Sequence, residues 1–290
     1  MAQPALAVFQ ALDQALAAAV ASAAPSVIRI SRGRGGGSGI AWSDELVISS
    51  SFHTPDSTTV GIGTADGSLD ERAAEVIGRD PGTDVALLKV EGGGLTPAKF
   101  RESTENLGVG NLALALGRPG RTARASLRAI GVLGPSIKTH WGGTLDRYVE
   151  SDRQIPRGFA GGPLVDADGA VIGMNTRTLM RGTDLAIPTV TLRRVIDELK
   201  QHGGIRRGYL GVGTYPVAGG ALVASVEDGG PAATAGVLVG DVLVELDGVT
   251  IDHPDVLRTA LGERPGKAVK LAFVRAGNRQ EVDVTLGAKA

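Results

Sequence analysis

Residues 78–92 have the sequence GRDPGTDVALLKVEG, in which polar and turn-forming residues lead directly into an apolar run. The run over 85–92 predicts a buried strand, so Asp84 lies where that strand begins. An aspartate in this position most often caps a turn, and less often orients a catalytic histidine. The residues around this stretch are needed to decide between the two roles.

Short apolar stretches continue on both sides of residues 78–92, separated by turn residues every eight to twelve positions. This spacing is typical of an all-β barrel or sandwich, and two successive sets of stretches predict two barrels. A loop is expected over 33–39, where the sequence is rich in glycine. After the second set, residues 190–203 predict a helix with Leu192, Val195, Ile196 and Leu199 on one face and Gly203 as its end.

The chain divides into three predicted regions. Residues 1–24 are rich in alanine and leucine and predict a helix, with Leu6, Phe9, Leu12 and Leu16 at helical spacing. The two barrels and the closing helix occupy 25–203, and the segment 203–208 is a linker candidate. Residues 208–290 combine strands with two short helices, which predicts a small independent α+β domain.

Bulk composition excludes several classes of function. The 290 residues carry 30 basic and 31 acidic side chains, so no basic field is expected to attract nucleic acid. The chain has no cysteine, which excludes disulfides, thiolate metal sites and a cysteine nucleophile. His140, His202 and His253 lack ligand spacing, and no glycine-rich phosphate loop precedes a helix, so we expect neither metal nor cofactor.

The N-terminal region bears on location. No lysine or arginine precedes Arg29, and Gln10, Asp13 and Gln14 interrupt the apolar residues. We therefore expect neither a signal peptide nor a membrane span, and a cytoplasmic location. The alternative is a periplasmic or extracytoplasmic location, reached with a signal that was removed before residue 1.

Three features in order along the chain suggest chemistry on polypeptides. His53 follows a predicted strand, Asp84 opens a later one, and GFAGGP (158–163) forms a glycine-rich turn in the second barrel. Acyl transfer requires a nucleophile, a base, a group that orients the base, and backbone N–H donors for the oxyanion. Each feature alone has an ordinary structural explanation, but their combination in this order is demanding.

These features resemble the HtrA family of trypsin-like serine proteases with a C-terminal PDZ domain, over nearly the whole chain. The resemblance rests on GSGIAWSDELVISSSFH before residue 54, on residues 78–92, and on RGFAGGPLVDADGAVIGMNT (157–176). It implies a chymotrypsin-like double β-barrel, with His53 as general base and Asp84 as its orienting group. It also implies that Gly158 and residue 160 supply the oxyanion N–H groups, and it suggests a small aliphatic residue before the scissile bond, with Ile155 and residues 174–176 as pocket walls.

Position 160, where the family has its nucleophilic serine, is Ala160. Alanine has no hydroxyl to acylate, so we expect the chain to be an inert endopeptidase scaffold for unfolded polypeptides. The alternative is a natural non-catalytic relative that binds peptides and regulates an active family member. Retention of His53 and Asp84 favours an engineered alanine, whereas Thr54-Pro55 and Arg157 depart from the family pattern and favour natural loss.

The C-terminal region resembles a PDZ domain, through GYLGVG (208–213) and the segment 225–248. Successive N–H groups of Leu210, Gly211 and Val212 can hold a terminal carboxylate. The simpler interpretation is that Leu210 and Val212 are core residues. The resemblance implies binding of polypeptides or protein C-termini, and a homotrimer built by the N-terminal helix. The expected peptide-binding residues are Tyr209, Leu210, Gly211, Val212, Leu257 and Leu261.

Overall fold

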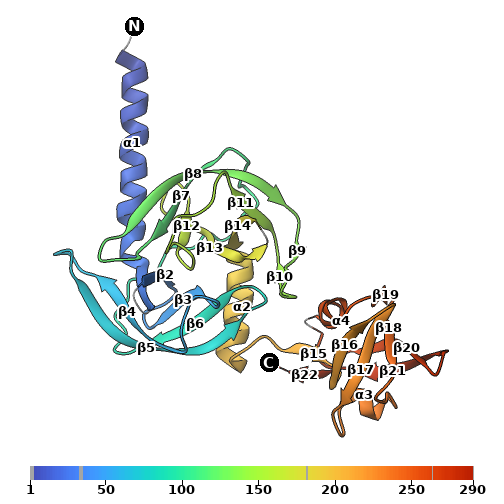
Figure 1. The fold of residues 1–290 in the computed structure, drawn as a ribbon. Helices are drawn as coiled ribbons and strands as arrows, with labels where there is room; N and C mark the ends of the chain where they lie inside the picture. Colours follow the sequence, from blue (N-terminus) through green and yellow to red (C-terminus); the bar gives the residue numbers. More distant parts are fainter. Residues whose placement is uncertain (1–2, 33–34, 181, 263, 290) are drawn as a thin grey trace. The chain divides into compact units, whose positions relative to one another are not determined.

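The computed structural model describes residues 3–32, 35–180, 182–262 and 264–289. The chain forms two compact units, Met1–Gly203 and Gly204–Ala290. The first contains the N-terminal helix, two β-barrels and a second long helix, and the second is a small α+β unit (Figure 1). The fold class expected from the sequence, mainly β with a chymotrypsin-like double barrel and a small α+β domain, is confirmed.

The first barrel closes in the strand order β1-β2-β3-β6-β5-β4. Ile28, Ile30, Val47, Val60 and Leu88 fill its interior, where every one of them is buried. Its strands are β1 Val27–Arg32, β2 Gly35–Ala41, β3 Leu46–Ser50, β4 Ser57–Gly63, β5 Leu69–Asp80 and β6 Val85–Val90.

Strand β2 corrects the expected loop over 33–39, of which residues 33–34 lie outside the described residues. From Gly35 onward the segment pairs with β1, and Gly37 lies opposite Ile30. Four of the first five residues of β2 are glycine, so the sequence offers no alternation of apolar and polar side chains. Backbone pairing to β1 and β3 holds this strand in place.

The second barrel closes in the order β11-β14-β13-β12-β7-β8, and a short hairpin, β9-β10, lies outside it. Ala115, Ile130, Val149, Leu164 and Ile172 are buried in its core. The barrel strands are β7 Leu112–Gly117, β8 Arg124–Gly134, β11 Tyr148–Ser151, β12 Pro163–Val165, β13 Val171–Met180 and β14 Thr183–Pro188; the hairpin is β9 Ile137–Lys138 with β10 Thr144–Leu145.

Helix α2 (Thr189–His202) packs against β5 and β6 of the first barrel and against β13 and β14 of the second. The predicted apolar face is buried, and the helix ends as expected at Gly203, which adopts a left-handed conformation. The N–H of Gly203 donates to the carbonyl of Leu199 at 2.9 Å, and its carbonyl accepts the N–H of Arg79 at 3.0 Å. The helix therefore joins the two barrels from outside.

Helix α1 (Gln3–Ala23) stands away from the barrels over most of its length (Figure 1). The helix itself was expected, but its apolar residues are not covered: Leu6, Phe9 and Leu12 are 59%, 68% and 40% exposed. Leu6–Ser26 is long and apolar enough to cross a membrane, by length and composition alone. A signal sequence passes the same test, so the expected absence of a membrane span finds no support in this helix.

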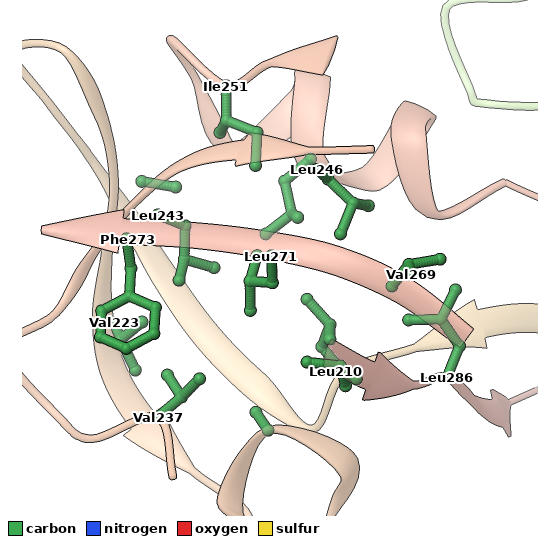
Figure 2. Close-up of a cluster of buried hydrophobic side chains, with 14 residues drawn as sticks. Leu210, Val223, Val237, Leu243, Leu246, Ile251, Val269, Leu271, Phe273 and Leu286 are labelled. Carbon is green, nitrogen blue, oxygen red and sulfur yellow. The ribbon is translucent and has the colours of Figure 1, made fainter. Parts of the chain in front are cut away.

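The second unit places a sheet in the order β16-β17-β18-β20-β21, with β19 on β18, beside the two-stranded pair β15-β22. Its core gathers side chains from β17, β18, β20 and β21 and from the segments beside them, including Leu210, Leu243, Leu271 and Phe273 (Figure 2). The strands are β15 Arg207–Tyr209, β16 Val212–Val217, β17 Gly220–Val226, β18 Val242–Leu246, β19 Val249–Thr250, β20 Ala268–Arg275, β21 Asn278–Thr285 and β22 Gly287–Lys289; the helices are α3 Pro231–Thr234 and α4 Pro254–Leu261.

Candidate functional site

Strand pairing brings His53 and Asp84 together. Strand β3 runs antiparallel to β6, and its last residue, Ser50, lies opposite Val85 at the start of β6. The N–H of Ser51 donates to the carbonyl of Asp84 at 3.1 Å, and the N–H of His53 donates to that of Ser50 at 3.2 Å. The turn after β3 thus places His53 beside the residue that opens β6.

The Asp84 carboxylate is fully buried and lies between the two barrels. One oxygen, Oδ1, accepts the hydroxyl of Ser50 at 2.7 Å and the N–H of Phe52 at 3.1 Å. The other, Oδ2, accepts the hydroxyl of Thr176, from β13 of the second barrel, at 2.6 Å. A buried carboxylate requires such partners, because an unpaired charge in the interior is costly.

The link between His53 and Asp84 passes through Ser50. The Nδ1 atom of His53 lies 2.8 Å from the Ser50 hydroxyl oxygen, whose single proton is donated to Asp84. The Ser50 oxygen is therefore left to accept a proton from Nδ1, which leaves Nε2 as the free acceptor. Asp84 was expected to orient His53; in the structure the hydrogen bonds between them pass through Ser50, a site residue that the sequence did not reveal.

The turn that carries Ala160 is fixed by contacts with both barrels. The Ser38 hydroxyl donates to the carbonyl of Gly158 at 2.6 Å, and the N–H of Gly161 donates to the carbonyl of Asn175 at 2.8 Å. Gly161 has φ +83°, and a Cβ there would lie 2.2 Å from the Ser38 carbonyl oxygen. Only glycine fits this approach, so the turn is held closely against β2.

Two backbone donors at this turn have no acceptor. Among the described residues, neither the N–H of Gly158 nor that of Ala160 makes a hydrogen bond. An oxyanion hole requires free N–H groups beside the reacting centre. These groups donate hydrogen bonds to the negatively charged oxygen that forms only during the reaction. Both residues line the same cavity as His53.

This cavity, of about 200 Å³, brings His53, Gly158 and Ala160 together. Of the described residues that line it, none carries a hydroxyl or a thiol, so the cavity offers a base and oxyanion donors without a nucleophile. Ile155 and Met174, expected as pocket walls, are buried and are not among these lining residues. The lining consists of Arg32, Gly36, Gly37, His53, Arg157, Gly158, Ala160 and Arg177.

The environment of His53 favours its neutral form. Burial lowers the pKa of its imidazole below the ordinary 6.5, and the positive charges of Arg32 and Arg177 lower it further. The negative charge of Asp84 raises the pKa and offsets part of this effect. A neutral imidazole with a free Nε2 is the form that can act as a general base.

The second unit has its own cavity, of about 290 Å³, next to helix α4. All six residues expected from the sequence line it. Leu210 lines this cavity and also belongs to the hydrophobic core, where its side chain packs with those of the sheet (Figure 2). The lining consists of Tyr209, Leu210, Gly211, Val212, Thr214, Pro254, Leu257, Arg258 and Leu261.

Two donors in this second cavity are unsatisfied. Among the described residues, the N–H groups of Leu210 and Gly211 make no hydrogen bond, although Leu210 is only 1% exposed. Buried N–H groups normally have an acceptor, so this pair can receive one from a ligand. Two adjacent N–H groups beside Gly211 suit the carboxylate at the end of a polypeptide.

A third, larger hollow of about 880 Å³ lies on the first barrel, beside the start of β4, the middle of β5 and the end of β6. It contains none of the expected site residues. Asp44, Glu45, Asp56, Glu75 and Glu91 contribute carboxylates to its wall. No group of three or more histidine, cysteine, aspartate or glutamate side chains is arranged to hold a metal ion within the described part of the chain.

Comparison with known proteins follows the division into units. The domain family described as "Trypsin-like peptidase domain" matches residues 37–174, and the one described as "PDZ domain" matches residues 208–286. The first unit and its site therefore define a trypsin-like peptidase domain, joined here to a PDZ domain. More particularly, the chain belongs to the HtrA family of trypsin-like serine proteases.

Individual relatives agree with this family. A "probable periplasmic serine endoprotease DegP-like" of Pseudomonas putida strain W619 is 35% identical over 274 residues, which cover 87% of this chain and 56% of the relative. One of the same name from Brucella suis is 31% identical over 273 residues, which cover 87% and 52%. The chain thus spans about half the length of the curated relatives it matches.

Solved structures cover almost the entire chain. "HtrA-type protease AlgW with decapeptide" superposes with a TM-score of 0.67 at 25% identity, over 95% of this chain and 99% of that one. The "serine endoprotease from Yersinia pestis" has a TM-score of 0.68 at 26% identity, over 95% and 98%. The combination of two barrels and a PDZ domain in one chain is therefore shared with HtrA-type proteases.

The comparison corrects one expectation. A cytoplasmic location was inferred from the lack of a basic N-terminal segment, but the relatives are named periplasmic endoproteases, which contradicts it. The inference was wrong because it used the interruptions at Gln10, Asp13 and Gln14 to dismiss a segment that forms a continuous and largely exposed apolar helix.

We predict that the His53 ring titrates with a midpoint below pH 6.5, which NMR of its ring carbons can measure. The same ring in the urea-unfolded chain provides the reference. Replacing Arg177 with glutamine should raise the midpoint, because it removes a positive charge that disfavours the imidazolium. A midpoint at or above 6.5 in the folded chain would contradict the described environment of His53.

We also predict that Gly211→Leu abolishes binding of C-terminal peptides, because residue 211 has φ +77°, lines the cavity and has a free N–H. Isothermal titration calorimetry with a peptide that has a free carboxylate measures this effect. Gly219→Leu is the matched control, since residue 219 has φ +81° and lies in the β16–β17 turn outside the cavity. Equal affinity of the two variants would reject the assignment of the carboxylate to Gly211.

Proposed function

We propose that this chain is an HtrA-type endopeptidase scaffold that holds unfolded polypeptides without cutting them. The observation that carries the proposal is the cavity that His53, Gly158 and Ala160 line together, in which the N–H groups of Gly158 and Ala160 are free and none of the described lining residues carries a hydroxyl. General base, orienting network and oxyanion donors support peptide chemistry. The missing side-chain oxygen at residue 160 prevents the acylation step.

In this proposal His53 is the general base, and Asp84 positions it through Ser50. Gly158 and Ala160 supply the oxyanion donors. In subtilisin, loss of the serine costs about 2 × 10⁶-fold in kcat, whereas the oxyanion hole and binding alone retain about 10³–10⁴-fold over water. The expected consequence is a polypeptide that enters the cleft, contacts the donors and leaves intact.

The second unit adds a binding site for polypeptide C-termini. The free N–H groups of Leu210 and Gly211 support capture of a terminal carboxylate, and Leu257 and Leu261 supply apolar wall for the last side chain. Relatives solved with a decapeptide and with a tripeptide support binding of short chains by proteins of this architecture. Substrates are accordingly unfolded segments or exposed C-termini.

Location and assembly complete the proposal. The names of the relatives support a periplasmic or other extracytoplasmic location. The exposed apolar residues Leu6, Phe9 and Leu12 of α1 support self-association of the chain through this helix. We propose that the resulting assembly is a homotrimer. A second candidate function, regulation of an active family member by co-assembly, draws on the same helix and on the absence of a nucleophile.

Restoring the nucleophile tests the proposal. Ala160→Ser should convert the chain from one that does not cleave unfolded casein into one that does, because only the attacking hydroxyl is missing. Gel electrophoresis and mass spectrometry of the products measure cleavage. The double variant His53→Ala with Ala160→Ser is the matched control and should be inactive. If Ala160→Ser does not cleave although it folds, the departures at Thr54, Pro55 and Arg157 have removed the chemistry as well.

A further inference from the structure

The cavity around His53 is lined by three arginines that come from separate parts of the first unit. Arg32 ends β1, Arg157 lies in the turn before Gly158, and Arg177 belongs to β13. Of the described residues that line the cavity, none is an aspartate or a glutamate. The cleft therefore gathers positive charge from both barrels beside residue 160.

This charge is largely uncompensated. Among the described residues, Arg32 and Arg157 form no ion pair, and Arg177 reaches the carboxylate of Asp184 only at 3.6 Å. That carboxylate is 8% exposed and also accepts the N–H of Ile155 at 2.7 Å. Other arginines of the same unit are paired closely: Arg29 with Glu71, Arg72 with Asp70, Arg79 with Asp56, and Arg101 with Asp166.

Two free backbone donors add to this charge, and the neutral His53 ring contributes one acceptor, Nε2. The N–H groups of Gly158 and Ala160 are free, and the buried Asp84 has both oxygens engaged away from the cavity. The field of Arg32 and Arg177 reaches the His53 ring, since both lower its pKa in addition to the effect of burial. A group that enters this cavity thus meets three positive charges and two backbone donors, against one neutral acceptor on His53.

We propose that the cleft selects acidic segments of bound polypeptides, seating an aspartate or glutamate carboxylate among Arg32, Arg157 and Arg177. Planar guanidinium groups match the two oxygens of a carboxylate, which supports this partner over a neutral side chain. The inference rests on the proposed binding of polypeptides by the cleft and adds the substrate class. It replaces the small aliphatic preference that the family resemblance suggests.

The test compares two peptides that differ only in charge. One carries several internal aspartates and glutamates, the other carries asparagine and glutamine in their place, and both have an acetylated N-terminus and an amidated C-terminus. Because Ala160 does not cleave them, isothermal titration calorimetry measures binding to the full chain at equilibrium. We expect the acidic peptide to bind about tenfold more tightly. This factor corresponds to the summed binding free energy of a few partly exposed charge pairs.

Salt and variants identify the source of the preference. Raising the salt from about 0.05 to about 0.5 M should reduce it, because exposed charges are screened. Arg32→Gln and Arg157→Gln should each lower it by about two- to fivefold, the size of one exposed pair. Lys200→Gln, which removes the same charge from the exposed end of α2, is the matched control and should leave it unchanged. Thermal melting confirms that each variant is folded.

The outcomes separate the two proposals. Equal affinity for the acidic and the amide peptide overturns acidic selection and leaves polypeptide binding intact. An undiminished preference for the acidic peptide in the Arg32→Gln, Arg157→Gln double variant also overturns acidic selection by the cleft. The peptide carboxylate would then bind outside the cavity that these arginines line. Failure of every capped peptide to bind overturns binding by the cleft itself. The peptide with asparagine and glutamine, when its C-terminal carboxylate is left free, measures binding by the second unit instead. That binding should depend on Gly211 and not on Arg157.

Discussion

The buried carboxylate of Asp84 is the interaction on which the site depends. It is fully enclosed, and it accepts hydrogen bonds from Ser50 and Phe52 of the first barrel and from Thr176 of the second. A buried charge is tolerated only when such partners are in place, so the two barrels are held in the arrangement that satisfies it. This arrangement of the two barrels in turn determines where His53 and the turn at residue 160 lie.

The resulting cleft separates binding from chemistry. Ser50 passes the influence of Asp84 to the His53 ring, and the ring keeps a free Nε2 because its Nδ1 is engaged. Gly158 and Ala160 turn unpaired N–H groups into the same cavity. With no hydroxyl at residue 160, these groups can contact a polypeptide but cannot transfer its acyl group. The second unit has a similar feature, since the adjacent N–H groups of Leu210 and Gly211 are free to donate to a ligand.

Local sequence signals predicted much of this structure. Apolar runs between turn residues placed the barrel strands, the periodicity of 190–203 placed α2, and the motifs around His53, Asp84 and Gly158 placed residues that the fold brings together. Features that depend on several segments at once were missed. Ser50 is one of three consecutive serines, the glycines of β2 carry no alternation, and Arg32, Arg157 and Arg177 lie far apart in the sequence and meet only in the folded cavity.

The central claim is that residue 160 lacks a nucleophile within a site that is otherwise assembled. A fluorophosphonate, which reacts readily with a serine activated by a base and an oxyanion hole, tests this directly. Peptide mass spectrometry of Ala160→Ser after treatment should show a single adduct, located at residue 160, and the unchanged chain should show none. A folded Ala160→Ser variant that remains unlabelled, or labelling of the unchanged chain at another residue, would contradict the account.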